Sequence, residues 1–256
     1  MKVSICIPTY QSPATLKRLL DSIKIQTCTD YEIIVSDDTP GNEIEKLVGQ
    51  YTDLPLVYYK NPHSLGSPEN WNQAIRLATG EYIKIMHHDD WFTSSTSIAD
   101  YVDLMKQNPK AVFGFARHLT TFELDCLHKN PDILGLGNLI GAPSVTIFKN
   151  HTDLFFDRQL IWLVDIEFYI RILRKYPDFA YTSKNLVTIG SSDNRISDRI
   201  KDNKALIQKE QIYLEDKLDL QYNHFYFVYN YLRHKFILQV KRKIQSIWKQ
   251  LFFPAV

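Results

Sequence analysis

The chain has 256 residues, of which 45% are hydrophobic and 23% charged, and its formal net charge is +1. This composition is that of a globular protein and excludes a disordered chain, and the small net charge gives no global attraction to nucleic acid, so no nucleic-acid partner is expected. Three cysteines without metal-site spacing argue against a disulfide framework or zinc knuckle and favour a cytoplasmic location, and no run approaches the roughly 18 apolar residues of a membrane-spanning helix.

The first hundred residues alternate between short apolar runs and amphipathic segments, the pattern of parallel strands joined by helical crossovers. Strands are predicted at residues 3–7, 31–35, 56–59 and 82–86. Helices are predicted where apolar residues recur three and four positions apart, at Leu16, Leu19, Leu20 and Ile23, at Trp71, Ala74, Ile75 and Ala78, and at Ile98, Tyr101, Val102 and Met105. The sequence therefore predicts an α/β fold with a mainly parallel, open sheet flanked by helices.

Beyond about residue 111 the pattern is less regular. Further strands are predicted at residues 111–117, 144–149, 179–182 and 186–189, with a turn-rich stretch at 130–141. A clearer helix is predicted over residues 164–175, ending before Pro177. From about residue 200 onward the chain is predicted to be helical.

Polar clusters follow the first, second and fourth predicted strands, at residues 8–11, 36–39 and 87–91. The carboxyl ends of parallel strands meet at one edge of a sheet, where ligands of open α/β sheets bind, so we expect these clusters to form one site. No glycine-rich fingerprint follows the first strand, which argues against a dinucleotide-binding protein and against a P-loop enzyme.

Asp37 and Asp38 follow the second predicted strand. Acidic residues ahead of a helix are usually caps, but Asn42 and Glu45 supply a capping-box pattern of their own, which leaves the two aspartates without an evident structural task. A carboxylate at this edge is suited to accept the N3 proton of uracil or thymine. It would reject cytosine, which presents an acceptor at that position.

Two histidines and two aspartates are grouped at residues 87–90. One interpretation is a solvated loop in which Asp90 or Thr93 caps the next helix. The other is a divalent cation, bound through Asp89, that bridges to a diphosphate and neutralises the charge developing on it. Carboxylate and imidazole ligands together suit Mn²⁺ or Mg²⁺.

Asp165 lies near the start of the helix predicted at residues 164–175. Taken alone it is an ordinary first-turn residue, and Glu167 with Arg171 forms a helical ion pair of small energy. An attacking sugar hydroxyl needs a base within hydrogen-bond reach, and a carboxylate in apolar surroundings is a candidate. The polar loop at residues 190–195 is either a surface loop or a lid over a ligand.

The order and spacing of these segments resemble the bacterial family 2 glycosyltransferases with the GT-A fold, over about residues 1–198. Residues 3–10, 31–38 and 72–83 carry the similarity to the nucleotide-binding half of that family. The resemblance implies that Asp38 meets the uracil. The nucleotide-binding residues expected from it and from the strand-end clusters are Pro8, Thr9, Tyr10, Asp37, Asp38, Asn72, His88 and Asp89.

The family's metal triplet, Asp-any-Asp, is represented here by residues 87–89, with His87 in place of the first carboxylate. The resemblance implies a metal held by Asp89 and His87. It also makes Asp165, rather than Glu167, the catalytic base, and it places residues 141–144 on the acceptor side. The residues expected on the acceptor side or in a lid are Asp90, Trp91, Pro143, Ser144 and Arg195.

The resemblance implies a metal-dependent inverting glycosyltransferase of the hexosyltransferase type. It would move a sugar from a nucleoside diphosphate, by preference UDP, to a hydroxyl of a glycan or lipid-linked oligosaccharide during synthesis of surface polysaccharide, capsule or O-antigen. Two alternatives stay open. A nucleotidyltransferase acting on sugar phosphates should carry a glycine-rich, basic triphosphate loop, which the first strand lacks. A catalytically degenerate sugar-nucleotide-binding protein is suggested by His87.

Residues 199–256 are expected to form a C-terminal helical region after a GT-A domain at residues 1–198. No acidic residue follows Asp219, while lysines and arginines accumulate among apolar residues at helical spacing over residues 233–256. A basic amphipathic helix of this kind suits an anionic membrane surface, which predicts peripheral contact with the cytoplasmic face of the inner membrane. The alternative is a helix that packs on the catalytic domain or on the partner of a homodimer.

Overall fold

The computed structural model describes residues 2–151, 153–190, 200 and 202–220. Contacts divide the chain into a compact unit, Met1–Leu218, and a second unit, Asp219–Val256, of which residues 219 and 220 are described. The predicted basic tail and Arg195 lie outside the described residues. Among the helices that the structure describes, none is both long and apolar enough to cross a membrane.

Strands and helices alternate along the first half of the chain, as predicted. The strands are β1 (Val3–Thr9), β2 (Tyr31–Asp37), β3 (Leu56–Lys60), β4 (Tyr82–Ile85), β5 (Trp91–Phe92), β6 (Phe113–Ala116), β7 (Thr146–Lys149), β8 (Phe179–Thr182) and β9 (Val187–Thr188). The helices are α1 (Pro13–Lys24), α2 (Glu43–Val48), α3 (Ser67–Arg76), α4 (Ser97–Gln107), α5 (Thr121–Lys129), α6 (Val164–Lys175) and α8 (Lys204–Leu218), with short 3₁₀ turns η1 (Pro131–Leu136) and η2 (Pro143–Val145).

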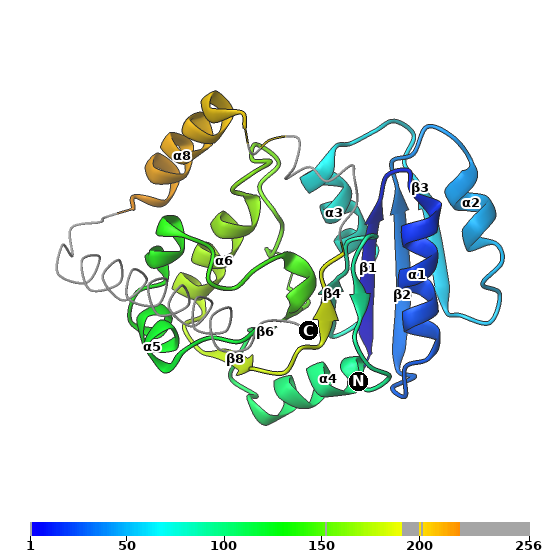
Figure 1. Cartoon of the computed structure of the whole chain (residues 1–256), viewed down its shortest axis with the longest axis horizontal. Helices are drawn as coiled ribbons and strands as arrows, with labels where there is room; N and C mark the ends of the chain where they lie inside the picture. Colours follow the sequence, from blue (N-terminus) through cyan, green and yellow to red (C-terminus); the bar gives the residue numbers. More distant parts are fainter. Residues whose placement is uncertain (1, 152, 191–199, 201, 221–256) are drawn as a thin grey trace, which may run out of the picture. The chain divides into compact units, whose positions relative to one another are not determined.

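The main sheet has the strand order β3-β2-β1-β4-β7-β6-β8. Its first four strands are parallel, β7 is antiparallel to both of its neighbours, and β6 and β8 are parallel. Figure 1 shows β1, β2 and β3 side by side, with α1 next to them. The predicted mainly parallel α/β sheet is confirmed. A small second sheet pairs β5 with β9 in antiparallel orientation.

Helices cover both faces of the parallel strands because side chains alternate along each strand. On β1, the fully buried Ile5 and Ile7 share one hydrophobic core with Leu16 and other apolar residues of α1. The Cys6 thiol lies on the other face and donates to the carbonyl of Ala74 in α3, at 3.5 Å. With both faces covered, ligands can reach these strands only at their ends.

Helix α5 was not predicted from the sequence. It begins with a capping box in which the Thr120 hydroxyl accepts the N–H of Glu123, and the Glu123 carboxylate accepts the N–H of Thr120 at 2.8 Å. Only Cys126 and Leu127 of this helix are buried. A hydrophobic stripe that narrow gives almost no periodic signal, so the cap was the one readable mark of the helix.

The capping box predicted at the start of α2 is wrong. Asn42 is the residue ahead of the helix, but its side chain makes no capping hydrogen bond. The argument that this box frees Asp37 and Asp38 from structural duties therefore fails, and both aspartates turn out to have such duties.

Helix α8 belongs to the compact unit that ends at Leu218 and contacts α6. The Arg174 guanidinium of α6 donates to the Leu218 carbonyl at 2.5 Å. These contacts carry the compact unit beyond residue 198, the predicted end of the GT-A domain.

Candidate active site

The carboxyl ends of β1, β2 and β4 lie together. Thr9 and Asp37 are register partners at the ends of β1 and β2, and the N–H of Asp38 donates to the Thr9 carbonyl at 3.0 Å. The N–H of Met86, just after β4, donates to the Cys6 carbonyl at 2.9 Å. The three predicted polar loops therefore leave one edge of the sheet, as its parallel order requires.

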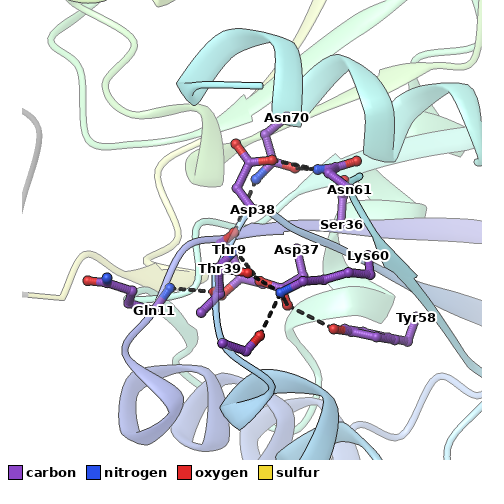
Figure 2. A network of polar contacts seen from close by, with 11 residues as sticks. Thr9, Gln11, Ser36, Asp37, Asp38, Thr39, Tyr58, Lys60, Asn61 and Asn70 are labelled. Carbon is purple, nitrogen blue, oxygen red and sulfur yellow. Dashed lines mark hydrogen bonds and ion pairs between the residues drawn. The ribbon is translucent and has the colours of Figure 1, made fainter. Parts of the chain in front are cut away.

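Asp37 is fully buried in a structural network (Figure 2). One carboxylate oxygen accepts the N–H of Thr39 at 2.8 Å, and the other accepts the Tyr58 hydroxyl at 2.8 Å and the Lys60 ammonium at 3.0 Å. Burial and this hydrogen bond raise the pKa of Tyr58. Asp37 thus joins β2 to β3 and holds the start of the following loop, a task that the sequence did not reveal.

Asp38 is buried and ties the loop before α3 to the end of β2. Its Oδ2 accepts the N–H groups of Leu65 and Gly66 at 3.0 and 2.9 Å and the Ser64 hydroxyl at 3.3 Å. Its Oδ1 accepts only the Asn61 amide, at 2.7 Å, among the described donors. A carboxylate oxygen has two lone pairs, so Oδ1 keeps one of them for a further donor. Asp38 therefore combines a structural duty with a remaining acceptor site.

Two buried polar atoms beside Asp38 have no hydrogen-bond partner among the described residues. They are the Thr9 hydroxyl oxygen and the Asn61 carbonyl oxygen, on residues that are 1% and 5% exposed. The Asn61 amide nitrogen contacts Asp38 and also Asn70, at 3.0 Å (Figure 2). Tyr10, next along the chain, is 45% exposed. Unpaired buried polar atoms are rare in folded proteins, and here two belong to residues at the carboxyl edge of the sheet.

The loop after β4 holds the two histidines. The backbone N–H of His87 donates to the Ser144 hydroxyl at 3.0 Å, and its imidazole lies 4.6 Å from the Trp71 ring, centre to centre. The buried Nε2 of His87 has no partner among the described residues. Burial lowers the pKa of His88, which also bonds the backbone of Pro8. The loop is therefore held in place by these contacts, while His87, His88 and Asp89 stay half-exposed.

Asp90 is 2% exposed and closes this loop. Its Oδ1 accepts the N–H of Gly190 at 2.9 Å, and burial raises the pKa of its carboxyl against the opposing effect of His87. Asp90 does not cap α4, whose first residue follows Thr96 without a side-chain cap. A Cβ on Gly190 would lie 1.8 Å from the Asp89 carbonyl oxygen. Only glycine fits against the loop at this point.

Trp91 lies beneath an arginine from α1. The Arg18 guanidinium carbon is 3.7 Å from the centre of the Trp91 ring, and the guanidinium donates to the Asp89 carbonyl at 2.7 Å. This cation–π contact and the hydrogen bond fix the backbone on both sides of Asp90. Trp91 was predicted on the acceptor side, and that role stays a prediction.

Pro143 and Ser144, also predicted on the acceptor side, are both buried in η2. Ser144 supports the loop after β4: its hydroxyl accepts the His87 N–H, and its carbonyl accepts the Lys84 ammonium. Lys84 is itself 1% exposed, and burial lowers its pKa to about 7. The hydrogen bonds of Ser144 are thus with β4 and with the loop that follows it.

Asp165 occupies the first turn of α6. Its Oδ1 accepts the N–H of Ile166 at 2.9 Å, and its Oδ2 accepts the Asn138 amide at 2.7 Å. The side chain retains partial solvent exposure, yet burial raises the pKa of its carboxyl to about 6, against the lowering effect of these hydrogen bonds. A carboxyl with this pKa is ionised at neutral pH and close enough to it to exchange protons.

Gly141 forms the turn beside Asp165. Asn138 accepts the Gly141 N–H at 2.7 Å and donates to its carbonyl at 3.1 Å, and the Tyr169 hydroxyl donates to the same carbonyl at 3.0 Å. Gly141 has a φ of +104°, and a Cβ there would lie 2.8 Å from a guanidinium nitrogen of Arg117. The predicted acceptor-side turn and the predicted base are therefore held together by one amide.

Asn72, predicted to bind nucleotide, is 3% exposed. Its amide nitrogen donates to the Phe156 carbonyl at 2.9 Å and its oxygen accepts the Phe156 N–H at 2.8 Å. This pair of bonds fastens α3 to the chain ahead of α6. The structure assigns Asn72 a structural task, because its amide is fully engaged away from the strand-end loops.

Residues 4–175 match the family described as Glycosyl transferase family 2. The chain belongs to this family. An uncharacterized glycosyltransferase of Methanocaldococcus jannaschii is 35% identical over 92 residues, 34% of this chain and 32% of the relative. Abequosyltransferase RfbV of Salmonella typhimurium is 34% identical over 95 residues, 35% of this chain and 28% of the relative. The chain thus spans about a third of the length of these curated relatives.

Solved structures agree with the family assignment. S. aureus TarS in complex with UDP-GlcNAc is similar with a TM-score of 0.63 at 17% identity, over 76% of this chain and 60% of that chain. Mannosyltransferase PcManGT from Pyrobaculum calidifontis, in complex with GDP-Man and Mn²⁺, is similar with a TM-score of 0.61 at 18% identity, over 80% of this chain and 62% of that chain. The family 2 chain therefore has the GT-A fold.

Several residues of this family 2 site could not be found from the sequence. Asn61, Asn138, Lys84 and Arg18 each hold a predicted site residue or its loop through contacts between distant parts of the chain. A buried lysine inside an apolar strand was the one available signal, because lysine is almost never fully buried without a partner.

Proposed function

We propose that this family 2 chain is an inverting glycosyltransferase that moves a sugar from a UDP-sugar to a hydroxyl of a glycan or lipid-linked acceptor in surface-polysaccharide synthesis. The observation that carries the proposal is the environment of the Asp165 carboxylate. This carboxylate forms no ion pair within the described part of the chain, is oriented by Asn138, and has a pKa raised to about 6 by burial. A perturbed, accessible carboxyl without a structural ion pair is typical of a general base.

The unpaired atoms beside β1 and β2 support a uracil base at this site. Uracil presents one N–H between two carbonyls, and Asp38 Oδ1 has one lone pair left to accept it. The unpaired Thr9 hydroxyl can donate to a carbonyl of the base, and the Asn61 oxygen can accept a ribose hydroxyl. The exposed Tyr10 ring offers a stacking surface. Pro8, which precedes Thr9 in β1, completes the proposed pocket.

We include a divalent cation, Mn²⁺ or Mg²⁺, in the proposal. The fit rests on the buried, unpartnered Nε2 of His87, since imidazole and the Asp89 carboxylate are suitable ligands. No group of three or more His, Cys, Asp or Glu side chains able to hold a metal is found among the described residues. The protein thus offers at most a partial ligand set, and a donor diphosphate would have to complete it. A bound cation would supply charge neutralisation at the leaving diphosphate.

The proton transfer follows from the base alone. Asp165 accepts the proton of the acceptor hydroxyl while that oxygen forms its bond to the anomeric carbon. The bond from the anomeric carbon to the phosphate oxygen breaks, and its electron pair leaves with UDP. Attack opposite the leaving group inverts the configuration. Asn138 keeps the carboxylate oriented throughout, because its amide bonds both the carboxylate and the Gly141 turn.

The names of the relatives support the acceptor class. One is a UDP-Glc:alpha-D-GlcNAc-diphosphoundecaprenol beta-1,3-glucosyltransferase of Escherichia coli, and another is a poly(ribitol-phosphate) beta-glucosyltransferase of Bacillus spizizenii. A lipid-linked acceptor would agree with membrane contact through the basic segment at residues 233–256. That contact and the homodimer alternative belong to the proposal, as does a GT-A domain at residues 1–198 to which α8 is added within the same compact unit.

Thermal-shift binding of UDP, GDP, CDP and dTDP, each with and without Mn²⁺, tests the donor site in wild type, Asp38→Asn and Asp89→Asn. The proposal expects UDP to stabilise the wild type most, and only when Mn²⁺ is present. This Mn²⁺-dependent stabilisation should be lost in Asp89→Asn. Stronger binding of GDP than of UDP would overturn the choice of base.

Catalysis is tested by UDP release from UDP-glucose and UDP-N-acetylglucosamine, with water in place of the acceptor. Release that depends on Asp165 supports the transferase. Nucleotide binding without any release, with sugar acceptors also inert, would instead favour a degenerate sugar-nucleotide-binding protein. His87 in place of a carboxylate is the observation behind that second candidate.

A further inference from the structure

A glutamate on α8 holds the chain that leads into α6. The Glu210 carboxylate is buried, at 3% exposure. Its Oε1 accepts the N–H of Ile161 at 2.9 Å, and its Oε2 accepts the N–H groups of Trp162 and Leu163 at 2.8 and 2.9 Å. Three consecutive backbone donors therefore converge on one side chain, 47 to 49 positions further along the sequence.

This arrangement pairs the carboxylate with backbone N–H groups that would each be unfavourable to bury alone. Backbone N–H groups at the approach to a helix have no acceptor inside the helix, and a buried carboxylate is unfavourable unless donors surround it. Glu210 has no ion pair within the described residues, so these three N–H groups supply its recorded stabilisation. Charge-assisted hydrogen bonds are the strong ones, and this carboxylate has three.

The position of α8 is fixed separately, near its other end. The Lys217 ammonium lies 2.5 Å from Asp157 and 2.9 Å from Glu167, and the fully buried Glu167 is also paired with Arg171. Asp157 further accepts the Tyr213 hydroxyl at 2.8 Å. These contacts hold helix α8 against α6 and against the segment ahead of α6. The Glu210 carboxylate is therefore attached to a fixed helix.

The predicted base follows this held segment immediately. Leu163 is the residue ahead of α6, and its carbonyl accepts the first helical hydrogen bond, from Glu167, at 3.0 Å. Asp165 is in the first turn, two positions after Leu163. A shift of the backbone at residues 161–163 would therefore move the Asp165 carboxylate relative to Asn138.

We propose that Glu210 is a positioning residue for the base Asp165, acting through the backbone of residues 161–163. The inference rests on the proposed function, in which Asp165 takes the acceptor proton. It places part of the catalytic support outside the residues that match the family, because that match ends at residue 175. Helix α8 is then a working part of the enzyme rather than an appendage.

The test uses the full chain with Glu210→Gln, which keeps the side-chain size but loses the charge and replaces one acceptor by an NH₂ group. The matched control is Asp216→Asn, which removes an exposed carboxylate from the same helix. UDP release from UDP-glucose and UDP-N-acetylglucosamine should fall by about 10- to 100-fold in kcat for Glu210→Gln, since a misplacement of about 1 Å can cost that much. The KM for the donor and UDP binding should stay within about twofold, because the donor loops lie on β1, β2 and β4.

A double-mutant cycle separates positioning from general loss of stability. If Glu210 acts through Asp165, Glu210→Gln should cost little further kcat in an Asp165→Asn background. Losses that multiply would overturn the proposal, as would wild-type kcat in Glu210→Gln. If Asp165→Asn keeps wild-type release, the base assignment fails by itself.

A second readout requires no turnover. The pKa of Asp165, obtained from the pH dependence of stability in wild type against Asp165→Asn, should move away from about 6 in the Glu210→Gln background, since displacement changes both the burial that raises this pKa and the Asn138 hydrogen bond that lowers it. An unchanged pKa would mean that Glu210 does not position Asp165, whatever the activity assays show.

Discussion

One amide, that of Asn138, joins the carboxylate of Asp165 to the turn at Gly141. The Asn138 nitrogen donates to Asp165 at 2.7 Å and to the Gly141 carbonyl at 3.1 Å, and its oxygen accepts the Gly141 N–H at 2.7 Å. Both the nitrogen and the oxygen of the amide are thus engaged. The position of the proposed base and the shape of the Gly141 turn therefore depend on each other.

Asn138→Ala should raise the pKa of Asp165 above its present value of about 6, because the lost hydrogen bond lowers that pKa. The acidic limb of kcat/KM against pH should move to higher pH. At about pH 6.5 activity should fall by about tenfold beyond the loss seen near pH 8.5, where the carboxylate is ionised in both proteins.

Asn108→Ala is a suitable control, since its amide bonds the Leu104 carbonyl at the end of α4. Its pH profile should match that of the wild type. An acidic limb that stays in place in Asn138→Ala would show that Asn138 does not set the pKa of Asp165.

Asp165→Asn should abolish most turnover and yet stabilise the protein at neutral pH. Burial raises the pKa of this carboxyl in the folded state to about 6, above its unfolded value, so the folded protein binds the proton more tightly. The wild type therefore loses stability as pH rises from about 4 to about 6. Asparagine carries no charge and escapes this loss. We expect a gain of on the order of 1–2 kcal/mol in unfolding free energy above pH 6, reduced for partial exposure and a changed hydrogen bond.

Chemical denaturation at about pH 4 and about pH 7.5 checks this. The gain should disappear at the lower pH, where both proteins are neutral at this site. Turnover should fall by about 10²- to 10⁴-fold, the usual contribution of a general base. A variant that is less stable than wild type at neutral pH would contradict the pKa argument.

The sequence predicted the sheet edge at which the candidate site lies, but not the residues that hold the site side chains in place. Periodicity placed Thr9, Asp37 and Asp90 at the carboxyl edge of the sheet, because strand ends follow from local pattern, although Thr9 and Asp37 are the last residues of β1 and β2 rather than loop residues. The hydrogen-bond partners of the site residues cannot be predicted from local pattern. Asn61 meets Asp38, and Asn138 meets Asp165, across 23 and 27 positions of the chain, so no local spacing records those contacts. Asp37 and Asp38 looked free of structural duties for the same reason.

The part of the chain after residue 111 was harder still to predict. Helix α5 has a narrow apolar face, and the sheet there combines antiparallel β7 with parallel β6 and β8. Neither gives the regular alternation of a βαβ unit. Glu210 looked like one charge in a helical region, since only the fold shows that it meets the backbone ahead of α6.

Gly190→Ala should disturb the loop that carries Asp89. A Cβ at Gly190 would lie 1.8 Å from the Asp89 carbonyl oxygen and 2.9 Å from an Arg18 guanidinium nitrogen. The clash with backbone cannot be relieved by a rotamer change, so the loop or Gly190 itself must move. We expect about 1–3 kcal/mol of destabilisation, as for overpacking, and a loss of Mn²⁺-dependent UDP stabilisation.

Gly49→Ala is the matched control. The nearest atom to a Cβ there is the Glu45 carbonyl oxygen at 3.4 Å, which is ordinary contact. Thermal shift with UDP and Mn²⁺ should give the wild-type response in Gly49→Ala. The same response in Gly190→Ala would show that the contact between Gly190 and the loop does not matter for the donor site.

Lys84→Met should gain stability over the wild type most at low pH. Lys84 is fully buried under the loop after β4, and burial lowers its pKa to about 7, although the Asp90 carboxylate acts in the opposite direction. Its unfolded pKa is about 10.4. Below about pH 7 the folded protein must bury an ammonium ion, and its desolvation is unfavourable. Between pH 7 and pH 10 the folded state holds a neutral amine while the unfolded state stays charged, so wild-type stability rises with pH.

Methionine fills a similar volume and has no titrating group, so its advantage should shrink by on the order of 3 kcal/mol between about pH 7 and about pH 10. Lys84→Gln also lacks the amine but can still donate to the Ser144 carbonyl, which accepts Lys84 in the wild type. The difference between the two variants should therefore be independent of pH, while each differs from wild type with the same slope. A wild-type slope equal to that of both variants would mean that the ammonium keeps its charge when buried. The Asp90 carboxylate, rather than the apolar ring of Tyr101 at 4.5 Å, would then control the electrostatics beneath the loop.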